Sequence, residues 1–93
     1  MTDRHVHVVV EGKVQGVWFR AWTEKAANRH GLAGWVRNRS DGTVEAVFSG
    51  PPDSVDIMLK DCRDGPPLAQ VTGLHVTDCD APGTKGFQIR PDG

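Results

Sequence analysis

The chain opens with a segment in which valine occupies every second position. Between His5 and Glu11 these valines are Val6, Val8 and Val10. Because the side chains of a strand point alternately to its two faces, the pattern predicts a strand with one apolar face. Two further strands are predicted at Leu32–Asn38 and Thr43–Ser49, joined by a hairpin turn that contains Asp41-Gly42. In the later strand Glu45 and Val47 alternate with more apolar positions, so we expect their face to be solvated.

Two other segments have helical spacing. Phe19, Trp22 and Ala26 recur at intervals of three and four, which predicts a helix from about Phe19 to His30 that Gly31 ends. A second helix is predicted from Pro52, because proline fits the first helical turn. Its apolar stripe consists of Val55, Met58, Leu59 and Cys62, and Gly65-Pro66-Pro67 ends it.

Two strands complete the pattern. In Ala69–Asp78 the alternation changes phase, so we expect a β-bulge near Thr72-Gly73. Phe87 and Ile89 alternate in a short final strand. The order predicts an α+β fold, a ferredoxin-like two-layer sandwich with a mostly antiparallel sheet of four or five strands and both helices on one face. A length of 93 residues fits a single domain spanning residues 1–93.

Composition narrows the classes of function. The chain has 11 basic and 12 acidic residues, whereas a general nucleic-acid binder would be basic, so we expect no nucleic-acid partner. No segment approaches the ~20 apolar residues of a membrane span, and the first residues lack the apolar stretch of a signal peptide. We therefore expect a cytoplasmic protein without a membrane partner. Cys62 and Cys79 form no CxxC pair and are expected to be free, buried thiols.

The segment Gly12–Arg20, with the sequence GKVQGVWFR, carries the candidate chemistry. Its two glycines lie between a predicted strand and a predicted helix, where main-chain amides can converge on an anion. Arg20 opposes the dipole of that helix unless a bound anion compensates, and its planar guanidinium suits a phosphoryl group. Ordinary solvated loops show the same features, so these residues alone leave both interpretations open. The segment matches neither GxxxxGK[ST] nor GxGxxG.

This segment resembles the first signature of the acylphosphatase family, G-x-V-Q-G-V-x-F-R, at all seven fixed positions. Gly34–Asn38 and Asp41–Glu45 resemble its second signature, G-W-V-x-N with a downstream D-G-x-V-E, and Gly65–Val71 and Gly86–Arg90 are similar to later family patterns. The resemblance implies hydrolysis of acyl phosphates to a carboxylate and inorganic phosphate, without a metal or other cofactor. We expect inorganic phosphate to be both product and inhibitor, and we expect a monomer because nothing in the sequence demands a larger assembly.

The resemblance further implies roles for individual residues. Arg20 would bind the phosphate together with loop amides, and Asn38 would position the attacking water. The loop residues implied in substrate binding are Gln15, Gly16, Val17, Trp18 and Phe19. Hydrolysis of an acyl phosphate needs no general acid, because the conjugate acid of its carboxylate leaving group has a pKa of about 4 and the group departs unprotonated. Positioning and charge stabilisation then dominate catalysis.

Alternatives remain open at this stage. Asn38 taken alone could simply shape the hairpin. The chain could be a non-catalytic ferredoxin-like module that binds a small anion or a protein, or a domain that handles carbamoyl phosphate within a larger maturation protein; the lack of an appended domain argues against the last.

The sequence also leads to expectations for individual histidine, tryptophan and arginine side chains. His5 and His7 could present a metal edge, but no third ligand of suitable spacing is evident. Trp22 and Trp35 are expected in the core. Trp18 either lines the mouth of the site or covers the edge of the core. Arg37 and Arg39 flank Asn38 and are interpreted as solvated side chains; the alternative is that they steer anions.

Overall fold

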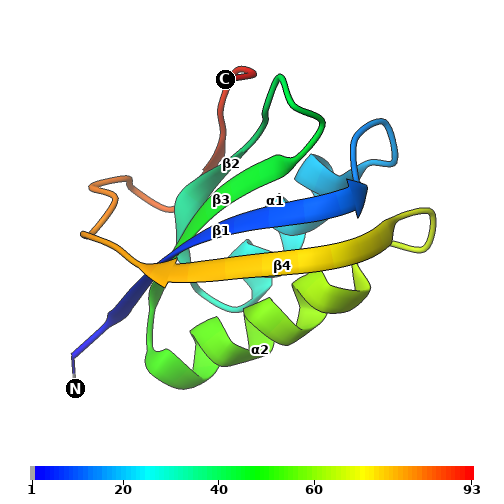
Figure 1. Ribbon diagram of the computed structural model, residues 1–93. Coiled ribbons are helices and arrows are strands. Elements are labelled where there is room, and N and C mark those ends of the chain that lie inside the picture. The colour runs from blue at the N-terminus through cyan, green and yellow to red at the C-terminus, as the bar shows by residue number, and fades with distance from the viewer. Residues whose placement is uncertain (1) are drawn as a thin grey trace.

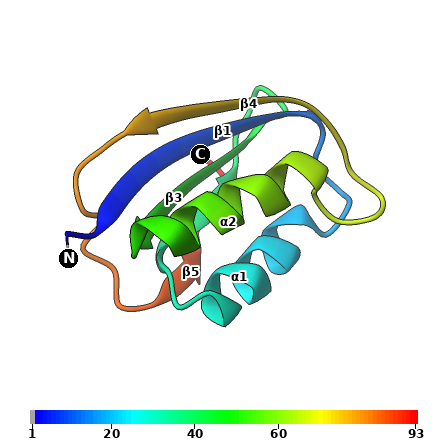
Figure 2. The same cartoon turned by 90° about the horizontal axis from the view of Figure 1, so that it is seen from below.

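Two helices cover one face of a five-stranded sheet, as Figures 1 and 2 show. The computed structural model describes residues 2–93. Its elements are β1 (Arg4–Lys13), α1 (Phe19–Arg29), β2 (Ala33–Asn38), β3 (Val44–Gly50), α2 (Pro52–Asp64), β4 (Gln70–Asp78) and β5 (Phe87–Ile89). The predicted ferredoxin-like α+β fold is confirmed, with element ends that differ by only one or two residues. No helix in residues 2–93 is long and apolar enough to cross a membrane.

The sheet order is β4-β1-β3-β2-β5, and only β2 and β5 pair in parallel. Both β1 and β2 pair antiparallel with β3, so they run in the same direction and end at the same edge of the sheet. Val44 of β3 pairs with Val10 on one side and with Asn38 on the other. Since neighbouring strands lie about 4.8 Å apart, Val10 and Asn38, which both pair with Val44, lie roughly 10 Å apart. Strand β1 continues past Val10 to Lys13, so the loop after β1 begins at the same edge of the sheet as Asn38.

The core lies between the sheet and the helices. The β1 valines predicted to share a face are at most 1% exposed, and Phe48 of β3 and Val55 and Met58 of α2 are fully buried against them. Each such side chain contributes about 1.5–3 kcal/mol by leaving water. This packing holds the strand ends, and with them the loop after β1, in fixed positions.

The bulge predicted in β4 is confirmed. Glu11 pairs with Gly73 and Gly12 with Val71, which leaves Thr72 as the extra residue. Gly12 has φ +122°, and a Cβ atom there would lie 2.0 Å from the carbonyl oxygen of Gln70. Only glycine fits this position, because any side chain would overlap the β4 backbone.

Three expectations about burial are wrong. The outer face of β3 is largely covered, since Val47 is only 6% exposed between His7 and Trp35. Trp35 lies on this outer face rather than in the core, because it is one residue out of phase with buried Gly34 and Val36. Its ring contacts the guanidinium groups of Arg37 and Arg90, with centroid distances of 5.3 Å and 4.8 Å.

The third wrong expectation concerns Cys79, which is half-buried, whereas Cys62 is buried; both are free thiols. Trp22 lies at the margin of the core. It is partly buried and packs edge-on against Phe19, with the ring centroids 5.4 Å apart.

Candidate active site

Buried valines on either side anchor the loop between β1 and α1. Val14 is 1% and Val17 5% exposed, and between them the chain turns outward at Gly16, which has φ +72°. Trp18 at the start of α1 also has positive φ, at 65°, and is the only non-glycine residue between Thr2 and Gly93 that does. This left-handed conformation costs about 1–2 kcal/mol. Such strain persists where surrounding packing enforces it, and it is concentrated at functional sites.

The main-chain amides of this loop are free. Within residues 2–93, no hydrogen bond connects the N–H groups of residues 15–21 to another protein group, and the first such bond in α1 runs from Trp22 N to the Trp18 carbonyl at 2.9 Å. No side chain caps the helix. Unpaired amides at a helix N-terminus, next to residues in left-handed conformation, form a typical anion-binding site.

Arg20 lies in the first turn of α1, beside these amides. Its Nη1 lies 3.2 Å from Oδ1 of Asp92, and the two side chains are 41% and 67% exposed. An exposed ion pair of this kind is worth only about 0.2–1 kcal/mol. A doubly charged anion bound to the loop amides can therefore displace the Asp92 carboxylate from the guanidinium.

Asn38 is the last residue of β2. It pairs with fully buried Val44, so its side chain points to the face of the sheet that the helices cover. Its main-chain oxygen accepts a hydrogen bond from Gly93 N at 2.9 Å, whereas its side-chain amide has no protein partner in the part of the chain described here. That amide is half-buried and free to bind a water molecule as both donor and acceptor.

Gln15 connects the loop to the β2–β3 turn. Its Nε2 donates hydrogen bonds to the carbonyl oxygens of Arg39 and Thr43, each at 2.8 Å. Because these carbonyls follow Asn38 closely in the chain, the Gln15 side chain fixes the two halves of the site relative to one another. Its side-chain amide is thus committed to positioning the loop.

A pocket of about 470 Å³ joins these elements. The residues that line it are Val14, Gly16, Trp18, Phe19, Arg20, Ala21, Asn38 and Ile89. Of the seven site residues expected from the sequence, the pocket lining includes Gly16, Trp18, Phe19, Arg20 and Asn38, but neither Gln15 nor Val17. Trp18, for which the sequence left two interpretations open, is one of the residues that line this pocket.

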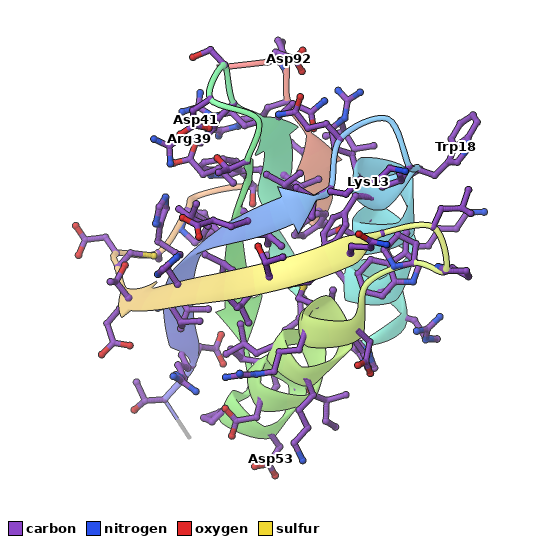
Figure 3. The ribbon with its side chains drawn as sticks, turned by 45° about the vertical axis from the view of Figure 1, so that its right-hand side comes forward. Lys13, Trp18, Arg39, Asp41, Asp53 and Asp92 are labelled. Atoms are coloured by element: carbon purple, nitrogen blue, oxygen red, sulfur yellow. The ribbon has the colours of Figure 1, made fainter. Side chains whose placement is uncertain are left out.

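Sequence reasoning missed Ile89 as part of this pocket and Asp92 as the partner of Arg20. Ile89 reaches the site because β5 pairs in parallel with β2, where Ile89 lies opposite Val36. Asp92 follows the same strand and lies at the same end of the molecule as the β2–β3 turn (Figure 3). No local pattern marks either residue, because both depend on a pairing between distant segments.

The arginines that flank Asn38 already have acidic partners. Arg37 Nε donates to Glu45 at 2.6 Å, and His7 Nε2 lies 2.6 Å from the other oxygen of Glu45. Burial raises the pKa of Glu45, but hydrogen bonds with His7 and Arg37 outweigh it and hold the pKa below its ordinary value. Arg39 Nη2 lies 3.7 Å from Asp41. Among the residues that line the pocket, Arg20 alone carries a charge.

The histidines at the start of β1 are hydrogen-bonded to protein side chains. His5 Nδ1 lies 2.7 Å from the Ser49 hydroxyl, and His7 contacts Glu45 as described above. Between residues 2 and 93, no group of three or more His, Cys, Asp or Glu side chains is arranged to hold a metal ion.

Comparison with known proteins identifies the family. Residues 6–89 match the acylphosphatase family model. An acylphosphatase of Rhodospirillum rubrum is 57% identical over 84 residues, which cover 90% of this chain and 92% of that protein. The structure of an acylphosphatase from Coxiella burnetii superposes with a TM-score of 0.91 at 38% identity, covering 96% of this chain and 94% of the other.

A full-length HypF, solved in a phosphate- and nucleotide-bound form, shares the fold with a TM-score of 0.89 at 22% identity. This chain corresponds to 12% of that protein, with 98% of its own length covered. The likeness to HypF concerns the fold alone. From the family model and the curated relative, the chain belongs to the acylphosphatase family of hydrolases.

Proposed function

We propose that the protein hydrolyses acyl phosphates to a carboxylate and inorganic phosphate. In this proposal Arg20 and the main-chain amides of residues 15–19 hold the phosphoryl group, and Asn38 positions the attacking water. The observation that carries it is the meeting of free loop amides, one guanidinium and one free carboxamide at a single pocket. The family match supports the same reaction.

Binding comes first in the proposed sequence. The phosphoryl oxygens accept hydrogen bonds from the loop amides and from the guanidinium of Arg20, displacing Asp92. Because the guanidinium is planar, it can donate two parallel hydrogen bonds to one phosphoryl group. The amides are held in place before the substrate arrives, so little reorganisation opposes binding and transition-state stabilisation.

Hydrolysis then needs one water molecule. Asn38 holds the water near phosphorus through its amide, the water oxygen bonds to phosphorus, and the bond from phosphorus to the acyl oxygen breaks. The acyl group leaves as a carboxylate with the bonding electrons, and the proton of the water passes to a phosphoryl oxygen. No general acid is needed, because a carboxylate is a stable anion at neutral pH. All the side chains involved come from one chain, so a monomer suffices.

The direct test is hydrolysis of acetyl phosphate by the purified protein in the presence of a metal chelator. We expect acceleration over buffer, competitive inhibition by inorganic phosphate, and a raised melting temperature with phosphate. Arg20→Lys should weaken both phosphate inhibition and turnover, because lysine lacks the fork geometry. Arg39→Lys serves as the matched control, since Arg39 lies outside the pocket lining.

Asn38→Ala separates positioning of the water from binding of the phosphoryl group. It should lower kcat while leaving inhibition by phosphate nearly unchanged, because Asn38 acts on water rather than on the phosphoryl group. Normal turnover in Asn38→Ala would contradict the role proposed for Asn38. Phosphate binding without any hydrolysis by the wild type would leave a non-catalytic anion-binding module instead.

A further inference from the structure

The pocket is larger than the phosphoryl group requires. Its volume of about 470 Å³ lies within the ~300–1,000 Å³ typical of sites that hold whole small molecules. Arg20, Asn38 and the loop amides supply its polar groups. The remaining lining residues are apolar: Val14, Trp18, Phe19, Ala21 and Ile89. The space beyond the phosphoryl group is therefore bounded mainly by apolar surface.

Only two of these apolar residues offer much surface to a ligand. Val14 and Phe19 are 1% and 2% exposed and belong to the core, whereas Trp18 is 78% and Ile89 41% exposed. Four large apolar side chains are markedly exposed in residues 2–93, and two of them line this pocket; the other two are Ile57 and Leu68. Exposed apolar side chains gathered at one pocket indicate a contact surface for an apolar ligand group.

The backbone holds the Trp18 ring in the solvent. Its left-handed conformation is one that bulky residues rarely adopt, and Val17 and Phe19 on either side are buried. The side chain extends outward from the loop, as Figure 3 shows. Most of the indole surface is therefore open to a ligand.

We propose that Trp18 selects the acyl group, with Ile89 completing the apolar rim, so that the protein favours acyl phosphates with ring-sized apolar acyl groups over acetyl phosphate. This inference rests on the proposed hydrolysis of acyl phosphates. The bond from phosphorus to the acyl oxygen places the acyl group next to the phosphoryl site, and a flat apolar group there can stack on the indole. Aromatic stacking of this kind strengthens binding by about 3- to 10-fold.

The test compares benzoyl phosphate with acetyl phosphate, which share the phosphoryl group and differ in the acyl group. Trp18→Asn removes the ring and keeps a residue that tolerates positive φ, whereas Trp18→Phe keeps a ring. Because the main-chain amide of Trp18 belongs to the proposed phosphoryl site, the readout is the ratio of the two KM values measured on the same variant. Trp18→Asn should raise KM for benzoyl phosphate about 3- to 10-fold more than it raises KM for acetyl phosphate. Trp18→Phe should retain most of the preference. Leu68→Asn, at an exposed apolar residue outside the pocket, should change neither substrate.

A second readout separates acyl recognition from a general effect on the loop. Inorganic phosphate has no acyl group, so its inhibition constant reports any general effect of Trp18→Asn on the loop, and KM for benzoyl phosphate should change about 3- to 10-fold more than that constant does. Ile89→Ala should also weaken benzoyl phosphate selectively. If Trp18→Asn raises KM equally for both substrates, or leaves their ratio at the wild-type value, the inference fails while the proposed function stands. If the wild type hydrolyses neither substrate, the proposed function fails and the inference fails with it.

Discussion

In the proposed function the guanidinium of Arg20 binds the phosphoryl group, but in the structure it forms an ion pair with the carboxylate of Asp92. Arg20 Nη1 lies 3.2 Å from Asp92 Oδ1. The next residue is tied to the β2–β3 region by two main-chain hydrogen bonds, from Gly93 N to the Asn38 carbonyl at 2.9 Å and from Ser40 N to the Gly93 carbonyl at 3.1 Å. These bonds keep Asp92 beside the pocket. Phosphate must therefore displace a tethered competitor, and Asp92→Asn removes the charge of that competitor.

The size of the effect follows from the exposure of the pair. With side chains 41% and 67% exposed, the ion pair is worth about 0.2–1 kcal/mol. Since about 1.4 kcal/mol corresponds to a tenfold change in an equilibrium constant, Asp92→Asn should strengthen phosphate inhibition by about 1.4- to 5-fold. Loss of repulsion between the carboxylate and the bound phosphate acts in the same direction. The free energy of unfolding should fall by no more than about 1 kcal/mol.

The assay is inhibition of acetyl phosphate hydrolysis by inorganic phosphate at low and high salt. The difference in the inhibition constant of phosphate between Asp92→Asn and the wild type should be largest at ~0.01 M salt. It should shrink at ~1 M salt, where the Debye length is only about 3 Å. Asp53→Asn is the matched control, because Asp53 lies at the opposite end of the molecule (Figure 3). Unchanged or weaker phosphate inhibition in Asp92→Asn would refute the competition between Asp92 and phosphate.

Three further predictions concern the supporting structure. Gln15→Ala removes both hydrogen bonds between the loop and the β2–β3 turn, so it should lower the free energy of unfolding by roughly 1–2 kcal/mol and also reduce turnover. A free energy of unfolding, measured with denaturant, within ~0.5 kcal/mol of the wild-type value would contradict this. Glu45→Gln should be destabilising at neutral pH, because a carboxyl group with a lowered folded-state pKa contributes its full stabilisation above the ordinary Glu pKa of 4.5 and loses it as pH falls through the folded-state pKa. The loss of unfolding free energy in the variant should therefore shrink as pH falls below 4.5, and an equal loss at all pH values would exclude this origin. Burial raises the pKa of both thiols, to about 12 for Cys62, which is buried, whereas Cys79 is half-buried. A thiol reagent at mildly alkaline pH should therefore label Cys79 first, and earlier labelling of Cys62 would show that its burial is wrong.

Local spacing was sufficient for most of the fold. The valines of β1 and three of the four stripe residues of α2 are buried as their periodicity predicts, with Leu59 only partly buried, and the phase change in β4 identifies the bulge at Thr72. The expectation that Trp35 lies in the core is wrong. Its size favours burial, but its position in β2 places it on the sheet face without helices. Phase along a strand is thus a better guide than side-chain size.

The site could be predicted only in part. The loop and Asn38 lie in recognisable signatures, and the pocket brings them together. The parts that escaped prediction are non-local: Ile89 depends on the parallel pairing of β5 with β2, and Asp92 on the path of the chain beyond it. The Gln15 side chain likewise contacts carbonyl groups 24 and 28 residues away.

Strand β3 contributes no side chain to the pocket, yet both halves of the pocket depend on it. It acts as a spacer, since Val44 pairs with Val10 in the last part of β1 on one side and with Asn38 at the end of β2 on the other. During refolding, turnover should return only when both edges of β3 have paired, in step with hydrogen-exchange protection of its amides. Enzymatic activity in this small protein would then report completion of the central sheet rather than formation of the loop alone.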